Sequence, residues 1–393
     1  MNQLTIFDYI TDVEKQEEAK FNFTKANDSY VKYIVNNKIN DKKLRFEALK
    51  SVNNPKSIHG IYPYRGKISA IDAKQILEQL PKNSTLLDPF CGSGTILFEG
   101  QKLGMNVIGV DNNPLAYDLS KAKLEQEQLI KYEKETKAII SKGKLALETN
   151  QIEEMPESAL KHFHPESAKE IMSIAQQIDE MSSYVKGCYY GAIALTARGC
   201  NHYKWTSSTV GKDIEPKQYI CFYEKFLSKV IKHYESNLDK PKGRVFLGDS
   251  RELSKFIEPK SVDIVFTSPP YFDALDYTAY YGKIIYEIHQ QDRLKIKEGL
   301  IQKFNDYKED MIRVLNQIDI VTKDDAIIIF VVGDKKTKDG IIDGGEFFAS
   351  LRKSKPTYIA ERVYSGSQSQ IFDTLNKTNR KEQIVVWHKA EGF

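Results

Sequence analysis

The sequence is poor in cysteine and has no long apolar run. Its four cysteines, Cys91, Cys188, Cys200 and Cys221, form no CxxC pair and no spacing typical of metal ligands, which argues against structural zinc and for a reducing compartment. No stretch of about 18 apolar residues occurs, and the N-terminus lacks a basic segment followed by an apolar core. We therefore expect a cytoplasmic protein with no metal and no membrane partner.

An excess of charge of one sign is also missing. Lys and Arg number 57 against 54 Asp and Glu, so the formal net charge is only +3. No basic field of the whole molecule requires a nucleic-acid partner, and any such surface has to be a local patch made by folding. At 393 residues with 41% hydrophobic content, the chain fits one large domain with an insertion, or two domains.

Strand and helix patterns alternate in two separate parts of the chain. The first part has helical spacing at 70–80 and 96–103 and strand patterns at 85–87 and 106–110. The second part has helical spacing from about 280 to 315 and strand patterns at 244–247, 262–266, 326–332, 357–364 and 383–388. The first part, with two strand patterns, holds too few strands for a sheet of its own. The pattern therefore predicts one parallel α/β sheet interrupted by a helical insertion.

The segment between the two parts has helical spacing at 124–147, 167–183 and 217–238 and little strand signal. Its charge-dense stretch 121–144 predicts a solvated helix face. His162 and His164 could suggest a metal site, but no third ligand lies at a fitting spacing. Phe163-His164-Pro165 instead predicts a helix start. We divide the chain into an N-terminal arm (1–57), a core (58–120 and 244–393) and the helical insertion (121–243).

A glycine-rich loop connects the strand at 85–87 to the helix at 96–103. It reads Asp88-Pro89-Phe90-Cys91-Gly92-Ser93-Gly94-Thr95. Glycines let a ligand approach the backbone closely, and the N–H groups of a helix start can bind a carboxylate. The loop lacks the GxGxxG phosphate turn and the GK[ST] of a P-loop, which leaves a nicotinamide oxidoreductase as a distant alternative.

Polar residues follow two further strands. Asp111 and Asn112 end the strand at 106–110, where an acid is placed to bind both ribose hydroxyls of a nucleoside cofactor. Asp249 and Ser250 follow the strand at 244–247 and are candidates for the adenine edge. Upstream, Tyr64 offers an aromatic face to a sulfonium cation; a surface turn is the other interpretation of this segment.

Ser268-Pro269-Pro270-Tyr271 follows the buried strand at 262–266. The exocyclic amine of cytosine or adenine is a poor nucleophile, because its lone pair is delocalised into the ring, and it needs acceptors for its protons. The side-chain oxygen of Ser268 and the carbonyl of Pro269 are suitable acceptors, and the two prolines stiffen the loop. Tyr271 offers a face for a flipped base. A plain proline turn is the alternative interpretation.

Two of these segments resemble motifs of the DNA amino-methyltransferases. Residues 88–95 resemble their motif I, DPFxGSGT, and residues 268–271 resemble their motif IV, (D/N/S)PPY. The resemblance covers about 58–120 and 244–390, and implies a Rossmann-like seven-stranded class I methyltransferase core. It also implies S-adenosylmethionine bound by Tyr64, Asp88, Phe90, Cys91, Gly92, Ser93, Gly94, Thr95, Asp111, Asn112, Asp249 and Ser250.

The resemblance further implies methyl transfer to the exocyclic amine of a flipped DNA base, without a covalent intermediate. Serine in the first place of motif IV is usual among cytosine-N4 enzymes, and Asp or Asn among adenine-N6 enzymes. We therefore expect cytosine N4, with adenine N6 as the alternative, although the order of motifs I and IV does not fix the base. Cytosine-C5 methylation is excluded, because the chain has no Pro-Cys dipeptide. Such enzymes commonly act alongside a restriction endonuclease or another defence-system protein.

A basic and aromatic segment in the insertion, Thr196–Trp205, is the candidate DNA reader. Arg198, Lys204 and Trp205 suit phosphate contact and stacking, although a buried aromatic cluster would explain the tryptophan equally well. Two further alternatives remain. Residues 88–99 also resemble guanine-N2 RNA methyltransferases, which usually carry Asp or Asn before Pro-Pro-Tyr and a sizeable N-terminal RNA-binding domain. A non-catalytic subunit of the same fold would bind the cofactor without turnover.

Overall fold

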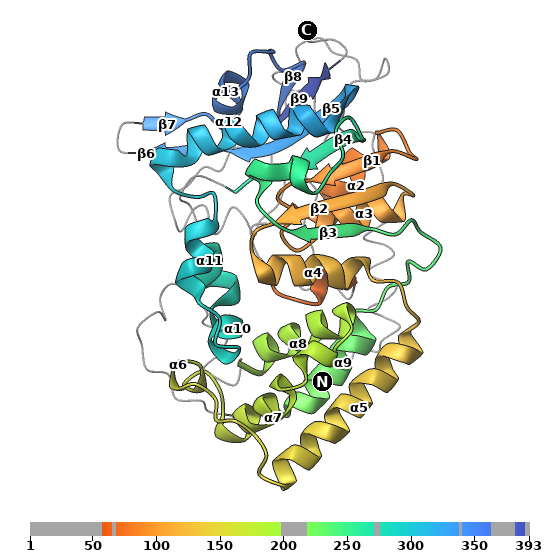
Figure 1. The fold of residues 1–393 in the computed structure, drawn as a ribbon, viewed down its shortest axis with the longest axis vertical. Coiled ribbons are helices and arrows are strands. Elements are labelled where there is room, and N and C mark those ends of the chain that lie inside the picture. Colours follow the sequence, from red (N-terminus) through yellow and green to blue (C-terminus); the bar gives the residue numbers. More distant parts are fainter. Residues whose placement is uncertain are drawn as a thin grey trace, which may run out of the picture.

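The computed structural model describes residues 57–64, 68–197, 218–270, 276–337, 340–362 and 382–389. Its centre is a seven-stranded sheet of order β3-β2-β1-β4-β5-β9-β8 (Figure 1). The strands are β1 (Thr85–Asp88), β2 (Asn106–Asp111), β3 (Arg244–Leu247), β4 (Val262–Thr267), β5 (Thr322–Gly333), β8 (Tyr358–Arg362) and β9 (Glu382–His388). The predicted Rossmann-like seven-stranded core is confirmed.

The direction of the last strand corrects the prediction of a parallel sheet. Every neighbouring pair from β3 to β5 is parallel, but β9 runs antiparallel to both β5 and β8. The sequence could not show this, because a continuous apolar run reports burial on both faces and not the direction of the strand.

Helices cover both faces of the sheet. On one face, α12 (Phe304–Val321) and α13 (Gly344–Ser350) contribute to a core with Leu87 and Val265. On the other, α2 (Ala70–Glu78), α3 (Thr95–Lys102) and α4 (Pro114–Leu124) pack around Leu86 and Ile264. Successive strand residues thus point to opposite faces, as the strand period of two requires.

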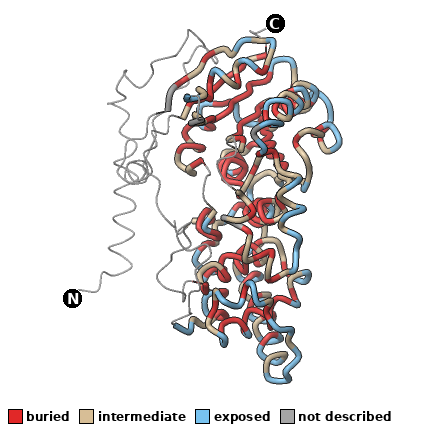
Figure 2. Tube along the Cα trace, turned by 90° about the vertical axis from the view of Figure 1, so that its left-hand side faces the viewer, coloured by how far each residue is buried: buried red, intermediate tan, exposed pale blue. Residues whose placement is uncertain are grey.

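Between α4 and β3 the chain forms a block of helices (Figure 1). In this block, α8 is the helix that packs against α4. The block comprises α5 (Leu129–Glu148), α6 (Glu157–Leu160), α7 (Pro165–Ala175), α8 (Ser183–Thr196) and α9 (Phe222–Lys232). A Cβ at Gly191 of α8 would lie 1.7 Å from the carbonyl oxygen of Ile61, so this helix packs directly on the backbone. Buried residues occur in both the sheet half and the helical half (Figure 2).

Several helices differ from the prediction in their bounds or in their exposure to solvent. The expected helix at 124–147 is divided, since α4 ends at Leu124 and α5 begins at Leu129. Lys123, in the stretch expected to be solvated, is only 1% exposed. The sequence pattern did not reveal α8, because this helix is buried on most of its circumference and has no clear polar face. The predicted helix start is confirmed: α7 begins at Pro165 with His164 as its N-cap.

The predicted helical stretch at 280–315 is also divided. It contains a π-helical turn (Thr278–Gly282), α10 (Lys283–Ile288), α11 (Arg293–Gly299) and the first part of α12. The remaining short elements are a hairpin of β6 (Lys335–Thr337) and β7 (Gly340–Ile342), and the 3-10 turns η3 (Ile58–Gly60), η4 (Ile178–Glu180) and η8 (Ser250–Lys255). Within the described ranges, no helix combines the length and the apolar character that a membrane span needs, and no group of His, Cys, Asp or Glu has a metal-binding arrangement.

Candidate active site

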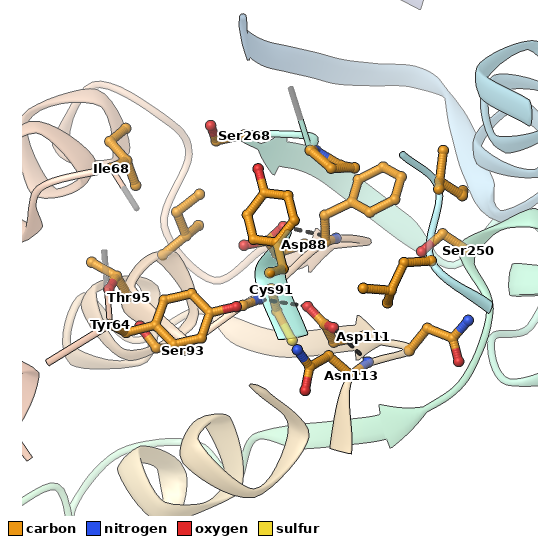
Figure 3. A pocket seen from close by; sticks show the side chains of 18 of the residues that line it. Tyr64, Ile68, Asp88, Cys91, Ser93, Thr95, Asp111, Asn113, Ser250 and Ser268 are labelled. Carbon is orange, nitrogen blue, oxygen red and sulfur yellow. Dashed lines mark hydrogen bonds between the residues drawn. The ribbon is translucent and has the colours of Figure 1, made fainter. Parts of the chain in front are cut away.

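A pocket lies where β1, β2 and β4 end (Figure 3). This is the side of an open α/β sheet at which ligands bind. Its lining is Tyr64, Ile68, Asp88, Phe90, Cys91, Gly92, Ser93, Thr95, Ile96, Asp111, Asn112, Asn113, Asp249, Ser250, Ser268, Pro270, Tyr277, Gly299, Leu300 and Ile301.

The predicted cofactor residues therefore converge on one pocket, with a single exception. Gly94 does not line it. Gly94 has φ +71°, precedes α3, and is so close to α4 that a Cβ would lie 2.8 Å from the Ser120 hydroxyl oxygen. Glycine is needed at this position for backbone conformation and packing.

Asp111 holds the glycine-rich loop in place. Its Oδ2 accepts a hydrogen bond from the backbone N–H of Gly92 (2.8 Å), and its Oδ1 accepts one from that of Asn113 (2.9 Å). Burial raises the pKa of this carboxyl to about 6 against the opposing effect of these hydrogen bonds. Each carboxylate oxygen has a second lone pair, so Asp111 can position the loop and still accept hydrogen bonds from a ligand.

Asp88 connects the ends of β1 and β4. Its Oδ1 accepts hydrogen bonds from the hydroxyl of Thr267 (2.7 Å) and from the backbone N–H of Phe90 (3.2 Å). Within the described part of the chain, its Oδ2 accepts no hydrogen bond. Burial, chiefly, raises the pKa of this carboxyl to about 7. A carboxylate with one free oxygen, buried at a pocket wall, is suited to binding a cationic group.

Arg251 is a residue of this region that the sequence did not single out. Its guanidinium forms a fork with the carboxylate of Asp249, with Nε 2.9 Å from both oxygens, and it also donates to Asp310 (2.9 Å). The carbonyl oxygen of Gly299 accepts from Arg251 (3.4 Å) and from Asn112 (2.7 Å). Asp249 is therefore not a free acceptor at the pocket, because the arginine sets its orientation.

The predicted catalytic loop meets the same pocket. Ser268 and Pro270 line it, whereas Pro269 is buried outside the lining, and Ser268 lies on the far side of Asp88 from Asp111 (Figure 3). The hydroxyl of Tyr307, a buried residue of α12, donates to the carbonyl oxygen of Pro270 (2.6 Å). This bond anchors the loop from the face of the sheet that α12 covers.

Four predicted residues lie outside the described part of the chain: Tyr271, Arg198, Lys204 and Trp205. The lining residues that sequence reasoning missed are Ile68, Ile96, Asn113, Tyr277, Gly299, Leu300 and Ile301. Asn113 and Ile96 directly flank recognised motifs and were within reach of the pattern. Gly299 ends α11, and Leu300 and Ile301 follow it. These three residues carry no local signal, and the hydrogen bonds to the carbonyl oxygen of Gly299 bring them to the pocket.

Comparison with known proteins agrees with this site. Residues 67–329 match the family model of the D12 class N6 adenine-specific DNA methyltransferase, and residues 7–122 match that of DNA methylase. The Type II methyltransferase M.MjaII of Methanocaldococcus jannaschii is 24% identical over 77% of this chain and 78% of its own length. The Type II methyltransferase M.MvaI of Kocuria varians is 26% identical over 62% of this chain and 59% of its own.

Solved structures show only distant likeness. The rRNA methyltransferase aviRa from Streptomyces viridochromogenes is 14% identical, with a TM-score of 0.31 over 84% of this chain and 88% of its own. A geranyl diphosphate methyltransferase is 7% identical, with a TM-score of 0.35 over 82% and 77%. We rest the fold on the strand order, and the function on the family match, which spans most of the core and of the helical block. The chain belongs to the D12 class N6 adenine-specific DNA methyltransferase family, and it is an S-adenosylmethionine-dependent DNA methyltransferase that acts on amino groups.

Proposed function

We propose that the pocket holds S-adenosylmethionine, with its ribose at Asp111 and its amino group at Asp88. The fit rests on three features of this structure. The carboxylate of Asp111 faces the pocket with lone pairs left for ribose hydroxyls. Asp88 presents one oxygen that accepts no hydrogen bond within the described part of the chain, where a protonated amine supplies the missing donor. The aromatic ring of Tyr64, also in the lining, suits a neighbouring sulfonium.

When bound, S-adenosylmethionine supplies an activated methyl group. The chain's contribution to the transfer is to hold the target amine. Ser268 lies at the pocket wall. Its hydroxyl oxygen accepts a hydrogen bond from an N–H of the amine and favours a pyramidal nitrogen, whose lone pair is then available for attack. The hydrogen bond from Tyr307 to Pro270 keeps this loop in place, and preorganised polar groups of this kind are a large source of catalysis. In this proposal Tyr271 supplies the stacking face for the flipped base.

The target that we propose is cytosine N4. The observation that carries it is Ser268 in the first place of the motif, where a neutral side chain lines the pocket. Adenine N6 is the second candidate, and the match of residues 67–329 to an N6 adenine-specific family favours it. Both targets are exocyclic amines, so the same acceptor serves either one.

The test is to methylate DNA with isotopically labelled S-adenosylmethionine, digest it to nucleosides and identify the labelled product by mass spectrometry. N4-methylcytosine is the expected product. N6-methyladenine would reverse the choice of base and leave the mechanism intact, whereas 5-methylcytosine would overturn both. Ser268→Ala should lower turnover by about 100-fold, since one preorganised contact is lost, with the affinity for the cofactor unchanged.

We further propose that the helical insertion, 121–243, recognises DNA, with Arg198 and Lys204 on phosphates and Trp205 as a stacking residue. The basic and aromatic side chains in 196–205 support the proposal, because they suit phosphate contact and stacking. Replacing Arg198 and Lys204 together by Ala should lower the salt dependence of DNA binding by a slope of about two. Lys131→Ala with Lys137→Ala, both exposed on α5 and paired with glutamates, is the matched control. An unchanged slope in the first variant would make the segment structural.

A further inference from the structure

A fully buried lysine lies beneath the glycine-rich loop. Lys123, near the end of α4, is 1% exposed. Its ammonium nitrogen lies 3.4 Å from the hydroxyl oxygen of Ser93 and 3.5 Å from that of Thr95. A third neighbour is Nδ1 of His59, at 3.3 Å. An ammonium group withdrawn from water in this way is expensive unless its charge is compensated.

The compensation comes through a histidine. A lysine ammonium can only donate hydrogen bonds, so Nδ1 of His59 accepts from Lys123. The ring proton is then on Nε2, which donates to Oε1 of Glu99 at 2.8 Å. Glu99, on α3, is also buried. Lys123 and Glu99 are therefore joined through the imidazole, and the lysine has a fixed position relative to the start of α3.

The lysine decides what the two hydroxyls can do. Ser93 and Thr95 are each 3% exposed and line the pocket. Because each hydroxyl oxygen accepts a hydrogen bond from the ammonium, its own hydrogen has to donate elsewhere. Neither hydroxyl donates to another protein group in the described ranges, and no side chain caps the start of α3. Both lie at the Tyr64 side of the pocket, away from Ser250 (Figure 3).

We propose that Lys123 is a positioning residue that turns the hydroxyls of Ser93 and Thr95 into donors for the carboxylate of the cofactor's methionine part. This inference rests on the proposed cofactor site. The carboxylate is the one anionic group of S-adenosylmethionine, and the combination of a helix start, two inward donors and a buried cation selects an anion. Lys123 thus provides its charge without contacting the ligand.

The experiment compares two ligands by calorimetry: S-adenosylmethionine and its decarboxylated form, which keeps the amine, the sulfonium and the adenosine. The wild-type protein should prefer the carboxylated ligand. Lys123→Met should lower the affinity for S-adenosylmethionine by about 10- to 100-fold, as expected for the loss of charge-assisted hydrogen bonds, and leave the decarboxylated ligand unaffected. Lys123→Arg should restore most of the preference, because it retains the charge.

Lys229→Met is the matched control. Lys229 is 3% exposed and donates to the carbonyl oxygen of Gly60 (2.7 Å), so it is an equally buried lysine that holds the segment next to His59. This variant should leave the ratio of the two affinities unchanged. If Lys123→Met fails to fold, Ser93→Ala with Thr95→Val removes the two donors directly and should reduce the same ratio.

The outcomes are distinguishable. A wild-type protein that binds neither ligand would overturn the proposed cofactor site itself. A wild-type protein that binds both, with a ratio that the Lys123 and hydroxyl variants leave unchanged, would overturn the role of Lys123 and leave the cofactor site standing. An equal loss for both ligands in Lys123→Met would make the lysine structural and would also reject the inference.

Discussion

Replacing Asp88 by Asn should stabilise the cofactor-free protein while it weakens cofactor binding. Both protein hydrogen bonds to this side chain, from Thr267 and from Phe90, end on Oδ1, and an asparagine oxygen can accept them in the same geometry. The change therefore removes a buried negative charge without disturbing the connection between β1 and β4. What is lost is the anionic oxygen that we assign to the cofactor's amine.

The magnitude follows from the pKa. Burial raises the pKa of Asp88 from an ordinary value of 3.8 to about 7 in the folded protein. Between these two pH values the unfolded chain has lost this proton while the folded protein still holds it. The free energy of unfolding therefore falls as the pH rises from about 4 to about 7. At about 1.4 kcal/mol per pKa unit, the cost reaches about 4 kcal/mol above pH 7 and is only about 1.5 kcal/mol at pH 5. The stabilisation by Asp88→Asn should accordingly grow by about 2.5 kcal/mol between about pH 5 and pH 8.5.

Denaturant unfolding of both proteins at the two pH values measures this difference. Asp263→Asn is the control: Asp263 lies at the amino end of β4, at the other end of the strands from Asp88, and is paired with Lys323. This variant should show no such gain in the free energy of unfolding. Calorimetry with S-adenosylhomocysteine should show an affinity about 10- to 100-fold lower for Asp88→Asn. A variant whose stability relative to wild type is independent of pH, or whose ligand affinity is unchanged, would refute the reasoning.

Three further predictions concern other parts of the site. Asp111→Asn should lower cofactor affinity about 10-fold and remove the part of the affinity loss that the wild type should show as the pH falls through about 6, because only the carboxylate accepts both ribose hydroxyls. The loss caused by protonation of Asp88 near pH 7 should remain, and unchanged calorimetry would remove Asp111 from the site. Tyr307→Phe deletes the hydrogen bond to Pro270 and should reduce turnover about fivefold with cofactor affinity unchanged; equal turnover would show that the loop needs no such anchor. Gly191→Ala places a Cβ 1.7 Å from the oxygen of Ile61 and should cost about 3 kcal/mol or more in denaturant unfolding; a small cost would mean that α8 shifts freely.

Local patterns determined a large part of this protein. All seven strands of the sheet were visible from apolar runs, and the glycine-rich loop and Ser268 loop were identified at strand ends, where the topology brings them to one pocket. These features are local because strand burial and turn chemistry depend on residues near in sequence. Helix α7 was recognised for the same reason, from Pro165 and its cap at His164.

Tertiary structure alone decided the rest. The antiparallel direction of β9 depends on its neighbours and not on its own apolar residues. Lys123 belongs to a charged stretch whose pattern predicts solvent exposure, yet Ser93, Thr95 and His59 surround its ammonium group from segments distant in the chain. Arg251 likewise holds Asp249 and the end of α11, at Gly299, through hydrogen bonds between distant segments. A sequence shows which residues can bear charge, but whether a charge is buried, and what compensates it, is set by groups that only folding brings within hydrogen-bonding distance.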